Sequence, residues 1–204
     1  WMIAQIWAEG TSVMQQLILF WHNHFGISDI IEHKQEYIHL NLLQNFAWGN
    51  VKELIKKITI DPAMLRFLNG RENVAGAPNE NYARELLELF TVGKGPLAGP
   101  GDYTTFTEQD VVALARALTG WRDTGFYTLD ANEPISVIFD EQTHDKGEKR
   151  LSGRFNNEII HNSENIEYEK VIEIIFEQPA VALHICRKLY RWFVHYRLTE
   201  TVEQ

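Results

Sequence analysis

Residues 11–25 read TSVMQQLILFWHNHF, and this stretch decides the fold class. Apolar side chains recur in it every three or four positions, so they share one broad face when the segment is wound as an α-helix. The same period runs through most of the 204 residues. The pattern predicts a mainly α protein, a helical bundle-like single domain over residues 1–204.

The starts of most predicted helices are marked by residues whose short polar side chains can accept a hydrogen bond from the first turn. These N-cap residues are Ser28 or Asp29, Asn50, Asp61, Asn79, Thr107 and Asn165. The predicted helices cover residues 11–25, 28–46, 51–58, 62–69, 80–91, 108–119, 165–177 and 179–197.

Two stretches break the helical period. Residues 94–105 are rich in glycine and proline, which predicts a loop. Residues 126–155 alternate between apolar and polar, and we expect a small β-hairpin insertion there. Its predicted strands are 135–139 and 149–151, on either side of a turn at 145–147.

Composition excludes several classes of protein. The formal net charge of −9 argues against nucleic-acid binding, which depends on a basic surface, and no apolar run is long enough for a transmembrane segment. One cysteine, Cys186, excludes an internal disulfide and a multi-cysteine metal site. The chain starts at Trp1 without an initiating methionine, so we interpret it as the central part of a longer protein.

The first candidate site residue is His24 in the segment WHNHF. On the helical wheel His24 lies inside the apolar face, whereas His22 points away from it. His24 is therefore either a hydrogen-bonded core histidine or a buried acid, base or ligand.

The second candidate segment, residues 79–90, is the most polar of the predicted helices. Glu80, Arg84 and Glu88 form one row along it, and Asn81, Glu85 and Glu88 form a second. One interpretation is a capped helix with ordinary surface ion pairs. The other is that paired carboxylates hold a divalent cation or perform acid–base work.

The last predicted helix carries a basic stripe in an otherwise acidic protein. The stripe requires negative partners, either glutamates of this chain or an anionic ligand. Its residues are His184, Arg187, Lys188, Arg191 and His195, and the candidate glutamates are Glu169, Glu173 and Glu177 or Glu80 to Glu88.

Two more candidate site residues are Arg116, on an apolar helix, and His144, in a predicted turn. Arg116 lies on an almost wholly apolar helix, so we expect it to be mostly buried and paired with Glu85 or Glu88. His144, followed by Asp145 and near Lys149, is a weaker candidate because turns recruit aspartate routinely.

The order of these motifs resembles one bacterial family, domain of unknown function 1800. The resemblance runs from about residue 11 to residue 194, although residues 94–105 lengthen a junction that is short in the family's usual pattern. It implies an exported protein (periplasmic, envelope-bound or secreted) about twice this length, and it implies no reaction. The motifs are FWHNHF at 20–25, DPAML at 61–65, PNENYAREL at 78–86, the segment 103–110, ARALTGW at 115–121 and HDKGEK at 144–149.

Two functional hypotheses follow. The first is a metal- or carboxylate-assisted hydrolase that acts outside the cytoplasm, with a divalent metal as the possible cofactor. The second is a non-catalytic helical module that binds an envelope or secreted partner protein. The hydrolase would use His24, Asn81, Glu85, Glu88, Arg116 and His144, and we expect His24 to approach Glu85 and Glu88.

Overall fold

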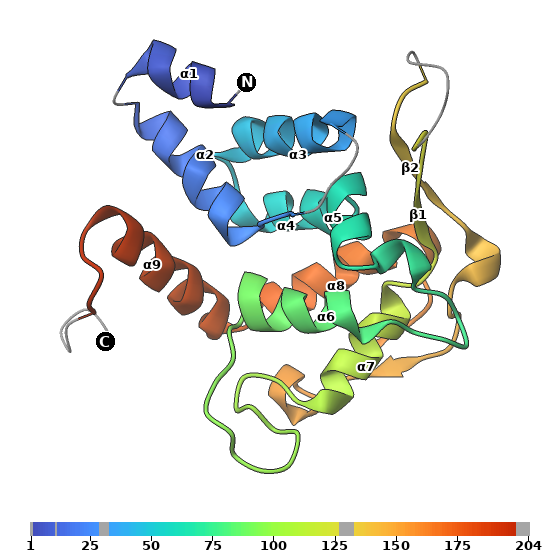
Figure 1. Ribbon diagram of the computed structural model, residues 1–204. Coiled ribbons are helices and arrows are strands. Elements are labelled where there is room, and N and C mark those ends of the chain that lie inside the picture. Colours follow the sequence, from blue (N-terminus) through green and yellow to red (C-terminus); the bar gives the residue numbers. More distant parts are fainter. Residues whose placement is uncertain (1, 11, 29–32, 127–132, 199–204) are drawn as a thin grey trace.

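A computed structural model describes residues 2–10, 12–28, 33–126 and 133–198, and these ranges are mainly α-helical (Figure 1). They contain nine α-helices and two small antiparallel sheets, as the sequence predicts for the fold class. The helices are α1 (Met2–Glu9), α2 (Val13–His24), α3 (His33–Phe46), α4 (Val51–Thr59), α5 (Pro62–Phe67), α6 (Glu80–Glu85), α7 (Glu108–Ala117), α8 (Glu167–Phe176) and α9 (Pro179–Phe193).

The N-caps that the sequence predicts set the starts of four helices. Asn50 accepts from the backbone of α4, Asp61 from that of α5 and Asn79 from that of α6. Thr107 and Asp110 form a complete capping box at α7. The structure confirms these four starts. They were predictable because capping depends on groups only two or three residues apart.

Other boundaries differ from the prediction. Helix α1 was not predicted, α3 is described from His33 onward, and α9 ends at Phe193 rather than at residue 197. The expected cap of α3 includes Asp29, which lies outside the described residues. Helix α8 begins at Glu167, after a short 3₁₀ turn, instead of at Asn165.

The predicted helix over residues 80–91 changes type half-way. α6 ends at Glu85 and continues as a π-helical segment, Leu86–Phe90. The hydroxyl of Thr91 donates to the Leu86 carbonyl at 2.6 Å. Carbonyls at the end of a helix lack partners within it, so those of Leu89 and Phe90 are available to neighbouring helices.

The β-structure is small, as expected, but its pairing was predicted wrongly. Strand β2 (Ser136–Phe139) pairs with β1 (Trp121–Thr124), and β3 (Lys149–Arg150) pairs with β4 (Ile159–Ile160). Thus β1 and β4 lie outside residues 126–155, and the predicted strands do not pair with each other. The turn between them is drawn toward α7 by Asp145, which binds Arg116.

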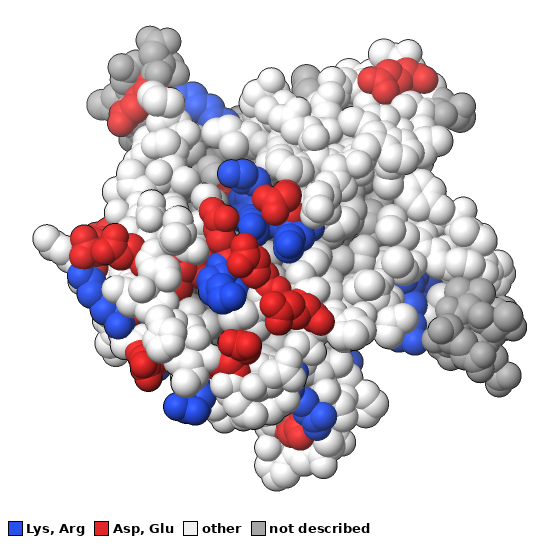
Figure 2. Space-filling view, turned by 180° about the vertical axis from the view of Figure 1, so that it is seen from behind, with Lys and Arg blue, Asp and Glu red and all other residues white. Residues whose placement is uncertain are grey.

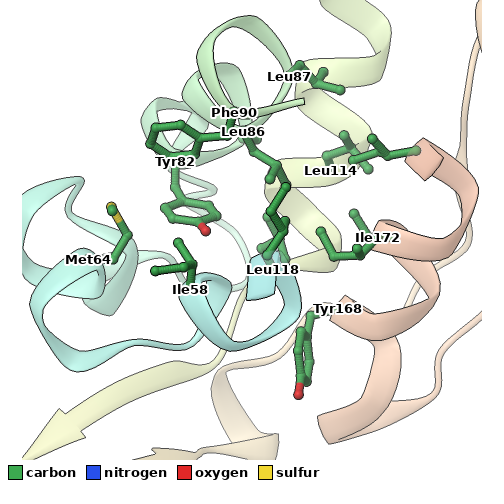
Figure 3. Close-up of a cluster of buried hydrophobic side chains, with 14 of the residues drawn as sticks. Ile58, Met64, Tyr82, Leu86, Leu87, Phe90, Leu114, Leu118, Tyr168 and Ile172 are labelled. Atoms are coloured by element: carbon green, nitrogen blue, oxygen red, sulfur yellow. The ribbon is translucent and has the colours of Figure 1, made fainter. Parts of the chain in front are cut away.

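The core lies where α4, α5, α6, α7 and α8 meet, and Figure 3 shows their apolar side chains converging. Helices α2 and α3 cover one side of this core, and α9 runs beside the end of α2 (Figure 1). Within the described ranges, no helix has the length and apolar character needed to cross a membrane. Central members of the core include Ile58, Tyr82, Leu86, Leu114 and Ile172.

Candidate functional site

Asn79 and Asn81 at the start of α6 fasten this helix to the preceding segment. Asn79 caps the helix, and its backbone N–H donates to Asn73 Oδ1 at 2.8 Å. The amide of Asn81 donates to the Leu68 carbonyl at 3.2 Å. Asn81, predicted as an orienting amide of an active site, therefore has a backbone partner at the end of α5.

Arg84 joins α6 to α7. Its guanidinium makes two bonds of 2.7 Å to the carboxylate of Glu108 and one of 3.0 Å to Glu80. The hydrogen bond from Arg84 lowers the pKa of Glu108. The predicted row Glu80–Arg84–Glu88 is thus half right, because Arg84 reaches Glu108 instead of Glu88.

The two carboxylates that the hydrolase hypothesis needs have different surroundings. Both oxygens of Glu88 accept from Lys94 Nζ at 3.0 Å. Glu85 is half-buried, and its pKa is raised by burial and by the nearby charge of Glu88. The fold therefore increases the proton affinity of Glu85.

His24 is buried, as the helical wheel predicts, and both ring nitrogens are occupied. Its Nδ1 accepts from Lys188 Nζ at 3.1 Å, so the proton sits on Nε2, which donates to the Phe90 carbonyl at 3.1 Å. Burial, followed by the charge of Lys188, lowers the pKa of His24 to about 3. The ring is neutral, and neither Glu85 nor Glu88 hydrogen-bonds to it.

The expected partner of Arg116 was wrong. Arg116 binds Asp145 through two bonds of 2.7 and 3.0 Å and donates to the Glu148 carbonyl at 3.0 Å. Its side chain is 30% exposed and therefore mostly, though not fully, buried. Sequence reasoning missed Asp145 as the partner because the contact depends on how the 144–149 turn folds back onto α7.

His144 belongs to a fully buried ionic cluster. Its Nδ1 donates to the Thr119 carbonyl at 2.9 Å, and its Nε2 lies 3.2 Å from Glu167 Oε2. Lys149 Nζ lies 2.6 Å from the other oxygen of Glu167 and donates to the Asp145 carbonyl. Burial lowers the pKa of His144, but the bonds to Glu167 and Thr119 outweigh it, and the pKa is raised overall.

Glu167 is the residue of this cluster that sequence reasoning missed. It is the first residue of α8, and it also accepts from the Ser163 backbone N–H at 3.1 Å. A fully buried lysine needs a carboxylate. The burial of Lys149 could not be predicted, because a strand of two residues is too short to show an alternation of apolar and polar side chains.

Two further buried carboxylates were not recognised as partners of basic groups. Asp61 caps α5 and also binds His39 Nδ1 at 3.0 Å, with both side chains buried. Asp123 on β1 binds two arginines, with Nε of Arg66 at 2.5 Å from Oδ2 and Nε of Arg71 at 3.0 Å from Oδ1. Both pairs join segments that are distant in the sequence.

Five of the six predicted residues bind partners in several different parts of the fold. Asn81 faces α5, Glu88 binds the 94–105 loop, His24 faces α9, and Arg116 and His144 hold the 144–149 turn. Across the described part of the chain, no three histidine, cysteine, aspartate or glutamate side chains gather closely enough to hold a metal ion.

One predicted residue lines a hollow. This α2–α9 hollow has a volume of about 230 Å³ and lies between the two helices for which it is named. Its lining contains two cationic side chains and no carboxylate. The lining residues are Phe20, Asn23, His24, Lys188, Arg191 and Trp192.

Comparison with known proteins agrees with the motif order. Residues 1–204 match the model of one family, described as protein of unknown function (DUF1800). The chain belongs to the DUF1800 family. No curated protein and no solved structure matches it. In this DUF1800 chain, Arg84 of the motif PNENYAREL binds Glu108 of the segment 103–110, and the motifs ARALTGW and HDKGEK bind each other.

Proposed function

We propose that this chain is a non-catalytic helical module that binds a partner protein. The observation that carries the proposal is the mutual pairing of the motif residues. Arg84 with Glu108 joins α6 to α7, and Arg116 with Asp145 joins α7 to the 144–149 turn. Paired charges at such positions orient elements and leave little capacity for a substrate.

The accessibility of the candidate acids and bases also supports this reading. A general acid or base must come within hydrogen-bond reach of its substrate. The side chains of His144 and Glu167 have no exposed surface, and Glu88 is bound by Lys94. Glu85, with its raised pKa, is the remaining argument for the hydrolase.

Metal analysis tests the metal-assisted form of the hydrolase hypothesis, and cross-linking tests the module hypothesis. We expect the full protein and its Glu85→Gln, Glu88→Gln double variant to contain equally little divalent metal by plasma mass spectrometry and to melt at similar temperatures. The module should also be cross-linked to the same partner protein in cells producing either form. One equivalent of metal in the wild type, lost in the variant, would contradict the proposal and support a metal-assisted hydrolase instead.

Export remains part of this proposal. Its support is the resemblance to a family whose members are typically exported, and we therefore expect the partner in the envelope or outside the cell. A fusion of the full protein to a reporter that is active only after export should give activity, and a purely cytoplasmic signal would contradict this part.

A further inference from the structure

The α2–α9 hollow combines positive charge with aromatic walls. Phe20 of α2 and Trp192 of α9 meet edge to face, with ring centroids 6.0 Å apart and ring planes inclined by 68°. Trp192 is 41% exposed, so its ring borders solvent at the hollow. Lys188 and Arg191 of α9 and Asn23 of α2 supply the polar atoms.

The two cations of the hollow lack the partners that similar groups have elsewhere in this chain. Among the described residues, no carboxylate oxygen lies within 4.0 Å of Lys188 or Arg191. Two of the glutamates expected to neutralise the basic stripe are engaged elsewhere, since Glu169 and Glu173 of α8 bind Lys56. Figure 2 shows acidic and basic side chains intermixed at the centre of the rear face.

The ammonium of Lys188 has one donor left over. An ammonium group carries three N–H donors. Lys188 uses two of them, toward His24 Nδ1 at 3.1 Å and the Leu89 carbonyl at 2.8 Å. Burial lowers the pKa of Lys188, so an anion beside it would stabilise its charged form.

His24 holds this lysine in position, and neither His24 nor the neighbouring His184 adds a charge. The neutral ring of His24 can only accept at Nδ1, which orients the ammonium. His184 bonds to the same Leu89 carbonyl at 3.0 Å, and burial lowers its pKa as well. The hollow therefore presents two positive charges, those of Lys188 and Arg191, against neutral neighbours.

We propose that the α2–α9 hollow binds a carboxylate side chain of the partner protein, between Lys188 Nζ and the Arg191 guanidinium. The inference rests on the proposed binding function and names the chemistry of its ligand. One ammonium N–H and a guanidinium fork match the two oxygens of a carboxylate. The rings of Phe20 and Trp192 would flank the methylene groups of that acidic side chain.

The size of the hollow favours a single side chain. Its volume of about 230 Å³ is below the roughly 300–1,000 Å³ of sites for drug-sized ligands. The charge of the whole chain, −9, repels acidic segments in general. On a surface that is negative overall, a local positive site fixes the place at which an acidic side chain of the partner can bind.

A nuclear magnetic resonance titration tests this directly. The probe is a blocked hexapeptide of alternating glycine and glutamate, added to the ¹⁵N-labelled full protein. We expect a saturable shift of the Trp192 indole signal, assigned with a Trp192→Phe variant. Arg191→Gln changes an exposed residue and should weaken binding by about tenfold, as should Lys188→Met.

Matched controls make the result specific. Lys57→Met removes an exposed lysine of α4 and should leave the affinity unchanged, and the glutamine version of the peptide should give no saturable shift. Equal shifts with both peptides, or none with either, would overturn the proposal. A saturable shift with inorganic phosphate or sulfate, but not with the glutamate peptide, would mean that the hollow binds another oxyanion instead of a carboxylate. None of these outcomes alters the metal content or partner cross-link that tests the module itself.

Discussion

Lys149 Nζ lies 2.6 Å from Glu167 Oε1, and neither side chain has any exposed surface. The second oxygen of Glu167 lies 3.2 Å from His144 Nε2. The pair joins the two-residue strand β3 to the first turn of α8. An ion pair this deeply buried constrains how these two elements pack against α7.

Removal of one member of this pair should be costly. Glu167→Gln leaves the Lys149 charge buried without a carboxylate, and we expect a loss of about 3–5 kcal/mol in the free energy of unfolding. Urea denaturation measures it. Lys146→Met breaks the exposed pair with Glu141 and should leave the free energy of unfolding almost unchanged. Similar losses in both variants would mean that the Lys149–Glu167 pair is solvated.

His24 should make stability depend on pH on the acid side. Its pKa is lowered to about 3 in the folded chain, so between this value and the unfolded value of 6.5 the unfolded state binds more protons. The contribution of the neutral His24 ring to stability is fully present above pH 6.5 and is lost as the pH decreases, with a slope approaching about 1.4 kcal/mol per pH unit. His24→Gln, which cannot titrate, should remove this part of the slope. An unchanged slope would show that other groups cause it.

The titration of His144 should change the stability of the protein with pH in the opposite direction. Its pKa is raised in the folded chain, so the protonated ring contributes stability below the unfolded pKa. That contribution is lost as the pH rises through the folded pKa. Denaturation midpoints from pH 6 to pH 9 should therefore decline more in the wild type than in His144→Gln. Parallel curves would assign the decline to other groups.

The geometry of Arg116 with Asp145 should matter as well as its charge. Arg116→Lys keeps the charge but loses the fork, and we expect a loss of about 1–2 kcal/mol by thermal denaturation. Arg122→Lys is the control, since Arg122 lies 3.5 Å from Asp140 and is 40% exposed. A loss of the same size in the control would mean that the fork contributes nothing.

Gly93 should not tolerate a side chain. Its φ of +73° favours glycine, and a Cβ there would lie 2.5 Å from Nδ1 of His184 on α9. Gly93→Ala should therefore destabilise by more than about 1 kcal/mol, and the added variant His184→Ala should restore part of the loss. Gly153→Ala, where a Cβ meets nothing within 4 Å, is the comparison. Equal melting temperatures for the two glycine variants would contradict this.

Features that depend on neighbours in the chain were predictable from the sequence. The caps Asn50, Asp61, Asn79 and Thr107 were located because each binds a backbone group two or three residues away. The burial of His24 followed from the helical period for the same reason. The order of the motifs was sufficient to identify the family, and the match over residues 1–204 confirms that identification.

Partners across the fold were decided only by the tertiary structure. Arg116 could be assigned a carboxylate but not Asp145, because the sequence contains no measure of how the 144–149 turn meets α7. The strand at 136–139 was located, but β1 as its partner was not. Helical period states which face is buried and not which helix covers it, so the approach of α9 to α2, and with it the hollow between His24 and Arg191, emerged only when the helices were packed.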